Sequence, residues 1–412
     1  MGQIQRAIAS GRLASTWIFA GPAGVGKFTT AVEFAKTVLC DQPKKVANGT
    51  LAYPIVHLAK NFELTVPCGV CDSCKAIGPA GAGAHPDLHI VTKELIRMHD
   101  RAGKSMGTTI SIQVIRGEIT GDPASGTESK MAKRSFRGRG KFFIVDEAEL
   151  MEGPAQNALL KTLEEPPAGS YLILVTANQA GLLSTIRSRS QIVEFHPLPD
   201  ALITQALAPA GLTETDAALI ARLARGSLGR ALEWSKDIRF IEEQLQKDAE
   251  KAEKKKAAKG EDDEDEEAWS RGGILGWTRA LGEKLDALVA GKATASEVGD
   301  VIADAAAQYA KLQVRRDRLM SADRAKRDGI GLMMTVAAEW FGDRMRHGLG
   351  TPHETVLPGE TGALDYGIAP ELIKTARDAE YWADRNVNDK MLLAAATTRW
   401  EELLHGAAAS PA

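Results

Sequence analysis

The stretch from residue 141 to residue 176 predicts two buried strands joined by a helix, and it constrains the fold more than any other part of the chain. An apolar run over 142–145 ends at Asp146 and Glu147, and a second apolar run follows at 171–175. Continuously apolar strands of this kind are typical of a parallel sheet whose two faces are both covered. A strand that ends in two carboxylates is typical of nucleotide hydrolases, which place a Mg²⁺ ligand and a general base there.

The segment between these two strands predicts an amphipathic helix. Pro154 suits the first turn of a helix, because proline lacks only an N–H that would have no partner there. Apolar residues then recur at helical spacing up to Leu163, and Pro166 and Pro167 end the pattern. The order strand, helix, strand therefore predicts an α/β domain.

A glycine-rich loop at 21–27 predicts a phosphate-binding site. It follows an apolar run at 17–20 and precedes a predicted helix over 28–39. Glycines allow backbone N–H groups to turn toward phosphates, a lysine adds a point charge, and the helix N-terminus adds its dipole. The candidate nucleotide ligands in this loop are Gly21, Gly24, Gly26 and Lys27.

Phe28 stands where such loops carry Ser or Thr, whose hydroxyl binds Mg²⁺. Thr29 and Thr30 follow, but each helical step rotates a side chain by about 100°. Neither hydroxyl therefore points in the direction that a Ser or Thr hydroxyl at position 28 would take. We keep Thr29 as a candidate ligand. The sequence thus predicts nucleotide binding with weak hydrolysis of ATP/Mg²⁺.

The cysteines predict a structural metal site. Cys68, Cys71 and Cys74 are closely spaced, and Cys40 is the only other cysteine in the chain. Four sulfurs complete a tetrahedral Zn²⁺ site without an open position, whereas a reducing cytoplasm disfavours disulfides. Two alternatives remain at this point: an iron–sulfur cluster, and His85 in place of Cys40 as the fourth ligand.

These motifs resemble the clamp-loader branch of the AAA+ ATPases. The resemblance is carried by the run FFIVDEAELMEGPAQNALLKTLEEPP, by TIRSRS, and by a cysteine module followed by His85-Pro86-Asp87. It extends over 11–235 and is local at 376–400. It implies an α/β AAA+ domain, a parallel sheet with flanking helices and an inserted zinc module, followed by a helical lid and an all-α collar domain.

The resemblance also assigns roles to three residues outside the phosphate loop. Arg189, in Ser188-Arg189-Ser190, matches an arginine that projects into the ATP site of a neighbouring subunit; Arg187 is the alternative. Thr176 matches the sensor 1 position. Arg230 matches the sensor 2 arginine of the lid, displaced by one residue because Gly229 stands where the motor subunits have it.

The same resemblance, with the composition, divides the chain into four expected parts. The segment at 246–270 is rich in charged residues and contains few large apolar ones. It therefore cannot bury a core, and we interpret it as a linker. The expected parts are an AAA+ domain at 1–198 with its zinc module at about 40–87, a lid at 199–245, a charged linker at 246–270, and a collar, which serves oligomerisation, at 271–412.

Within this family the chain is similar to a stator, a subunit with little ATPase activity of its own. The resemblance implies an accessory subunit of a DNA-directed DNA polymerase holoenzyme, a nucleotidyltransferase. Its implied partners are the delta and gamma/tau subunits of a hetero-oligomeric ring, and through that ring the sliding clamp and primed DNA.

The rival interpretation is an ATP-hydrolysing motor subunit of the gamma/tau type. Intact Lys27, Asp146 and Glu147 favour it. Phe28, Glu149 and Gly229 count against it, since Glu149 stands where the motor subunits have histidine and Gly229 where they have the sensor 2 arginine. A stand-alone zinc-bearing AAA+ protein is disfavoured by the collar-like C-terminus.

Composition adds two expectations. The net charge of −3 gives no general attraction to nucleic acid, so any DNA contact has to be local. A basic loop at 130–141 is interpreted as a flexible solvated insertion in preference to a phosphate contact. No apolar run approaches the roughly 18 residues of a membrane span, which favours a cytoplasmic protein without a membrane contact.

Overall fold

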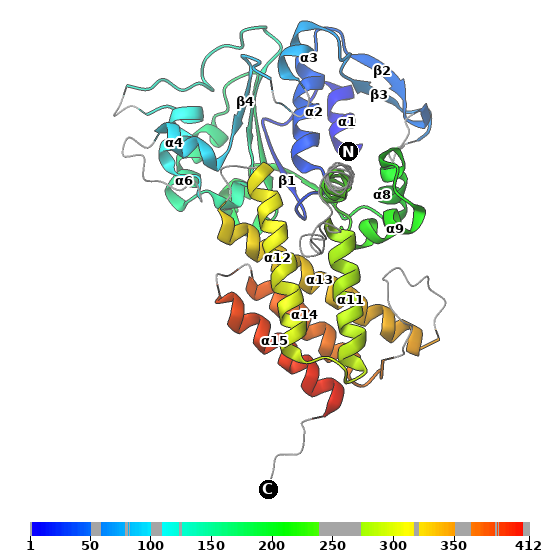
Figure 1. Ribbon diagram of the computed structural model, residues 1–412. Coiled ribbons are helices and arrows are strands. Elements are labelled where there is room, and N and C mark those ends of the chain that lie inside the picture. Colours follow the sequence, from blue (N-terminus) through cyan, green and yellow to red (C-terminus); the bar gives the residue numbers. More distant parts are fainter. Residues whose placement is uncertain are drawn as a thin grey trace, which may run out of the picture. The chain divides into compact units, whose positions relative to one another are not determined.

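The computed structural model describes residues 2–50, 59–78, 81, 83–99, 109–122, 126–238, 273–316, 321–350, 364–383, 385 and 387–406. The chain divides into two compact units, Met1–Pro197 and Leu198–Ala412 (Figure 1). Each unit has its own hydrophobic core. In the described residues, no helix is both long and apolar enough to cross a membrane.

A five-stranded parallel sheet organises the described part of the first unit. Its strand order is β4-β5-β6-β1-β7, and every neighbouring pair is parallel. Because parallel strands cannot be joined by a tight turn, crossover connections must link them. The strands are β1 (Thr16–Ala20), β4 (Leu88–Val91), β5 (Lys141–Val145), β6 (Ser170–Thr176) and β7 (Gln191–Glu194).

Helices cover both faces of this sheet. Alternate residues of β1 point to opposite faces, so Phe19 packs with α2 (Lys27–Leu39) and Ile18 with α6 (Gly153–Glu164). Burial of each such side chain contributes about 1.5–3 kcal/mol. The predicted parallel sheet with flanking helices is confirmed. The other helices here are α1 (Gly2–Ser10) on the Phe19 face and α4 (Ile96–His99), α5 (Ile112–Ile115), a π-helical turn (Arg116–Thr120) and α7 (Ser184–Arg187) on the Ile18 face.

A small module is inserted between α2 and β4. It contains an antiparallel pair, β2 (Lys44–Ala47) and β3 (Glu63–Val66), and the short helix α3 (Asp72–Ile77). The side chain of Gln5 joins it to α1, because its amide nitrogen donates to the carbonyl of Thr65 and its oxygen accepts from the N–H of the same residue. The module is therefore fixed to the body of the first unit.

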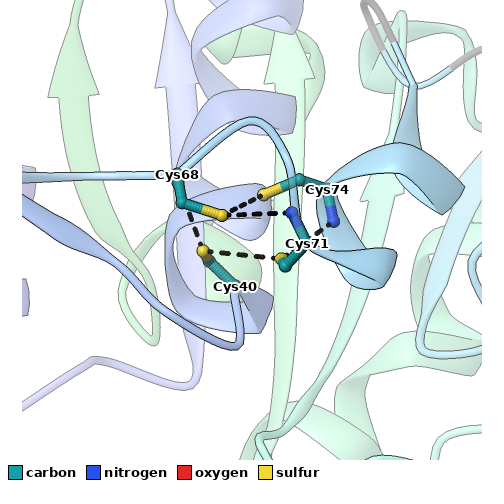
Figure 2. Close-up of side chains that lie close together, drawn as sticks. All are labelled: Cys40, Cys68, Cys71 and Cys74. Carbon is teal, nitrogen blue, oxygen red and sulfur yellow. Dashed lines mark hydrogen bonds between the residues drawn. The ribbon is translucent and has the colours of Figure 1, made fainter.

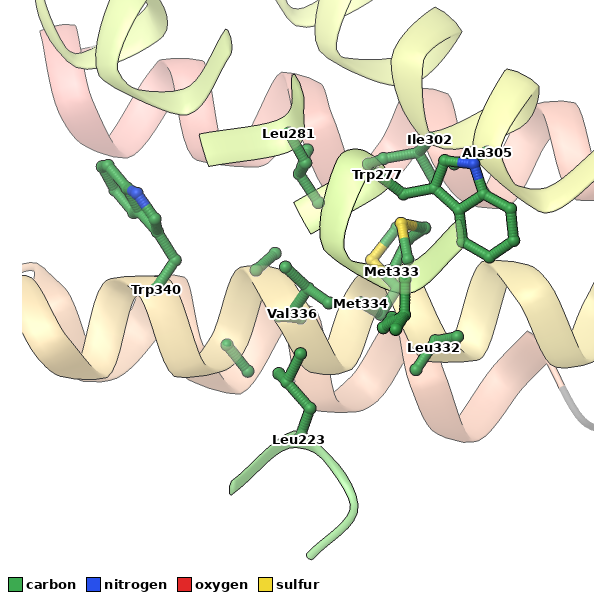
Figure 3. Packing of buried hydrophobic residues seen from close by; sticks show 14 of the residues in the cluster. Leu223, Trp277, Leu281, Ile302, Ala305, Leu332, Met333, Met334, Val336 and Trp340 are labelled. Atoms are coloured by element: carbon green, nitrogen blue, oxygen red, sulfur yellow. The ribbon is translucent and has the colours of Figure 1, made fainter. Parts of the chain in front are cut away.

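The described part of the second unit is helical. Its helices are α8 (Asp200–Leu207), α9 (Glu214–Leu223), a helix at 228–238, α11 (Gly273–Val289), α12 (Ala295–Arg316), α13 (Ala322–Gly348), α14 (Ala369–Ala383) and α15 (Asp389–His405). One core joins Leu223 of α9 to Trp277 of α11 and Trp340 of α13 (Figure 3). The predicted helical C-terminal part is confirmed, whereas the charged linker at 246–270 lies outside the described residues and the domain boundaries stay predictions.

Candidate functional site

The phosphate loop joins the end of β1 to the start of α2. Gly21 has φ +149°, and a Cβ added there would lie 2.1 Å from the carbonyl oxygen of Phe195, so only glycine fits. Gly26, with φ +90°, directly precedes α2. The first turn of a helix presents unpaired N–H groups, which makes this loop a suitable place for a phosphate.

Lys27 folds its ammonium back into this loop. The side chain is buried, and Nζ donates to the carbonyl oxygens of Gly21 and Pro22, each at 2.6 Å. Burial lowers the pKa of Lys27, while the negative charges of Glu149 and Asp146 oppose that shift. An incoming phosphate would have to replace the two carbonyl acceptors at Nζ.

Asp146 and Glu147 lie at the end of β5 but in different surroundings. Burial raises the pKa of Asp146, although the N–H of Glu147 donates to Oδ1 at 3.0 Å. The carboxylate of Glu147 instead forms an ion pair with Lys93, with Nζ 2.6 Å from Oε2. The candidate general base is therefore held by a cation of its own chain. Sequence reasoning missed Lys93, which follows β4, the neighbouring strand in the sheet.

Glu149 adds a carboxylate near the phosphate loop. One of its oxygens accepts from the N–H of Ala177 at 3.0 Å, and the other is buried without a hydrogen-bond partner in the described part of the chain. Glu149 interacts electrostatically with both Lys27 and Asp146. A carboxylate here repels phosphate groups and so weakens nucleotide binding.

The threonines proposed as nucleotide ligands have other surroundings. Thr29 is exposed on α2. Phe28 is half-buried and packs against the core on the face of the sheet that α2 covers. Thr176 is buried, and its hydroxyl oxygen accepts from the N–H of Asn178 at 3.1 Å, which closes a turn. The nucleotide roles of Thr29 and Thr176 stay predictions.

Arg230 belongs to the second unit. Its guanidinium lies over the ring of Trp234, 5.9 Å from the ring centroid, and both residues are on the helix at 228–238. A cation–π contact of this kind contributes about 0.5–1 kcal/mol at an exposed site. The sensor 2 role of Arg230 stays a prediction.

The four cysteines converge on one point (Figure 2). Cys40 follows α2, Cys68 and Cys71 precede α3, and Cys74 lies in it. All four sulfurs lie within 4.8 Å of one another, with Cys40 and Cys71 3.8 Å apart and Cys68 and Cys74 3.9 Å apart. A tetrahedral ion with bonds of about 2.3 Å to sulfur requires S···S separations of about 3.8 Å. The cluster therefore fits a closed tetrahedral metal site.

Hydrogen bonds and burial shift the pKa values of these thiols in different directions. The N–H groups of Val70 and Cys71 lower the pKa of Cys68 to about 6, whereas burial raises that of Cys74 to about 12. All four cysteines are free thiols. Four clustered thiolates, three of them buried, repel one another, so a divalent cation would stabilise them together.

His85 does not join this cluster. Its Nδ1 accepts from the N–H of Asp87 at 3.1 Å, and its Nε2 lies 3.3 Å from the hydroxyl of Ser73. Burial lowers the pKa of His85, which favours the neutral form of the ring. Cys40 is thus the fourth member of the set, and His85 supports the neighbouring helix through Ser73.

The basic loop is anchored by hydrogen bonds and so is not flexible as predicted, whereas most of its residues are exposed, as predicted for a solvated insertion. Asp87 is fully buried, and its two carboxylate oxygens accept from the N–H groups of Phe136 at 2.6 Å and Arg137 at 2.9 Å. The side chain of Arg137 also pairs with Asp41 at 3.2 Å. Sequence reasoning missed these partners because they lie far from the loop along the chain.

Arg189 lies exposed after α7. Its Nη2 is 3.0 Å from Oε1 of Glu164, and its Nη1 donates to the carbonyl of Thr185 at 3.2 Å. Arg187 is half-buried, with an Nε that has no hydrogen-bond partner among the described residues. Of the two arginines, Arg189 is the one whose guanidinium is better placed to reach another chain.

A parallel sheet of this order, with a phosphate loop after β1 and paired acids after β5, defines a P-loop domain of the AAA+ type. Residues 1–199 match the family described as DNA polymerase III, delta subunit. This match covers just under half of the chain.

Three curated relatives illustrate the similarity. The DNA polymerase III subunit delta' of Bacillus subtilis is 27% identical over 242 residues, which cover 59% of this chain and 60% of the relative. That of Escherichia coli is 34% identical over 166 residues, or 40% and 43%. The subunit gamma/tau of Mycobacterium tuberculosis H37Rv is 28% identical over 231 residues, or 54% and 32%. The matches thus span about half the length of the delta' relatives.

Proposed function

We propose that this chain acts as the delta-prime stator of the DNA polymerase III clamp loader and helps to load the sliding clamp on primed DNA. The observation that carries the proposal is the exposed guanidinium of Arg189, whose partners among the described residues are Glu164 and a backbone carbonyl. An arginine in this position supplies charge to the transferring phosphoryl group in a neighbour's ATP site. The delta' relatives support the same role.

The chain's own ATP site has little hydrolytic activity in this proposal. Phe28 leaves Mg²⁺ without a hydroxyl ligand, Lys93 holds the candidate base Glu147, and Glu149 repels phosphates. Lys27 and the glycines still allow a nucleotide to bind weakly. The chain is therefore an accessory subunit of a DNA-directed DNA polymerase holoenzyme rather than a motor.

The proposed partners are a delta subunit and gamma/tau subunits in one ring. The sliding clamp and primed DNA are reached through that assembly, and its place is the cytoplasm. The relatives named delta' and gamma/tau are both subunits of DNA polymerase III, which supports a hetero-oligomeric assembly.

We also propose that the cysteine cluster holds one structural Zn²⁺. The donor set is four sulfurs, and their separations suit bonds of the length that zinc forms with thiolates. A closed set leaves no position for a substrate. Bound zinc would join the end of α2 to α3 and so stabilise the inserted module.

A gamma/tau-type motor is the second candidate. The match to a gamma/tau relative and the intact Lys27, Asp146 and Glu147 favour it. ATP turnover by the isolated chain, and then by a reconstituted ring, separates the two functions. The stator predicts little turnover by the chain alone, and rapid turnover would establish the motor.

A further inference from the structure

One exposed aromatic side chain is presented by the basic loop. Phe136 is 82% exposed, although its backbone N–H is fixed by the buried carboxylate of Asp87. Hydrogen bonds to a charged group contribute about 1.5–3 kcal/mol each. The backbone of Phe136 is therefore fixed in place, while its ring is exposed to solvent.

The loop is held at several further points within the first unit. Met131 is buried, its carbonyl accepts from the hydroxyl of Ser170 at 2.9 Å, and the ammonium of Lys141 donates to the carbonyls of Lys130 and Lys133 at 3.1 and 3.2 Å. Arg139 donates to the carbonyl of Asp41 at 2.9 Å. Phe136 thus stands on a fixed support.

Four cationic residues flank Phe136 along the loop. Three of them have carboxylate partners: Lys133 pairs with Glu128 at 2.8 Å, and Arg137 and Arg139 pair with Asp41 at 3.2 and 4.0 Å. Against the carboxylates of Glu128, Asp41 and the buried Asp87, four cations leave a local charge of +1, on a chain whose net charge is −3. The four exposed cations are Lys133, Arg134, Arg137 and Arg139.

We propose that the loop at 133–139 is a contact site for single-stranded DNA, in which Phe136 stacks on an unpaired base and Arg134 and its neighbours bind the flanking phosphates. Surfaces that bind single strands combine an aromatic face with a positive surround. A duplex already covers the faces of its bases, so it cannot use the ring.

A protein partner fits the loop less well. The core of a protein interface is built from a cluster of apolar side chains, whereas Phe136 is the single large exposed apolar residue among the described residues of this loop. The proposal requires no particular assembly, since it concerns what this chain binds by itself.

The test is fluorescence anisotropy of the full chain with a labelled oligothymidylate of about 20 nucleotides, which exceeds one binding site of this kind. Phe136→Ala should weaken binding by about 5-fold or more, the low end of one aromatic–base stack. Phe136→Trp should keep the wild-type affinity. Met98→Ala removes a similarly exposed apolar side chain (78%) from the same unit and should have no effect.

The charge requires its own pair of variants. Arg134→Ala should weaken binding and reduce the slope of log K against log salt by about one. Lys44→Ala removes an exposed cation elsewhere in the first unit and should leave affinity within about twofold, since it makes no phosphate contact in this proposal. With a duplex of the same length, Phe136→Ala should make no difference.

Three results would overturn the proposal. The first is that the wild-type chain does not bind the oligonucleotide at about 50 mM salt, where phosphate contacts are strongest. The second is that Phe136→Ala and Met98→Ala bind equally well. The third is that Phe136→Ala leaves oligonucleotide binding unchanged but weakens joining to the other ring subunits, which would make the loop a protein contact.

Discussion

The guanidinium of Arg189 lies 3.0 Å from the carboxylate of Glu164, and both side chains are accessible, at 39% and 54% exposure. An exposed ion pair contributes roughly 0–1 kcal/mol to stability. Glu164 therefore orients Arg189 without burying it. In the proposed function, the phosphate of a nucleotide bound by a neighbouring subunit replaces Glu164 as the partner of Arg189 at little cost. The pair gives the free chain an arginine that is positioned in advance.

The first prediction concerns the metal. Elemental analysis should find one Zn²⁺ per chain, and Cys71→Ser should lose it and destabilise the first unit by about 4 kcal/mol or more, as expected for loss of a structural metal. His85→Asn is the control and should keep zinc, because His85 contacts Ser73 and Asp87 rather than the sulfurs. A coloured protein that contains iron would contradict this prediction.

The second prediction concerns the chain's own ATP site. Phe28→Thr should strengthen Mg²⁺-nucleotide binding, because it restores a hydroxyl where the metal needs one. Adding Lys93→Ala frees Glu147 from its ion pair, so the double variant should hydrolyse ATP faster than Phe28→Thr alone. Lys93→Ala by itself is the control and should remain slow. Equal rates for the single Phe28 variant and the double variant would show that Lys93 does not restrain Glu147.

The third prediction follows from Asp146, whose pKa burial raises above the usual value. The folded chain then binds a proton more tightly than the unfolded chain, so this group costs stability as the pH rises from the unfolded pKa through the folded one. Asp146→Asn should therefore raise the melting temperature at pH 7, and should do so less below the normal pKa of aspartate. Melting curves without nucleotide or Mg²⁺ test this, and a lower melting temperature at pH 7 would refute it.

Much of the first unit could be predicted because its signals are local. The apolar runs of β5 and β6, the glycines of the phosphate loop and the cysteine spacing each lie within a few neighbouring residues. The residues that were missed act across the sheet. Lys93 could have been found, since it follows a strand that ends at the same edge as Glu147.

Other features required the fold itself. Asp87 holds a loop about fifty residues further along the chain, and its role in His85-Pro86-Asp87 has no local signature. Glu164, at the end of α6, pairs with Arg189, just after α7, although strand β6 separates the two helices in sequence. Ion pairs and buried carboxylates of this kind depend on which helices and strands become neighbours in the fold. The hydrophobic periodicity of the sequence predicts the elements but not their neighbours.

Clamp loading on primed DNA by a ring that contains the Arg189→Ala chain tests the central claim most directly. The variant should fold and join its partners as the wild type does, since Arg189 is exposed. Loading should fall severely, because an arginine supplied to a neighbour's site contributes about 10³-fold or more to kcat there. Arg187→Ala, as the matched control, should load clamps normally. Loading at the wild-type rate by Arg189→Ala would contradict the account.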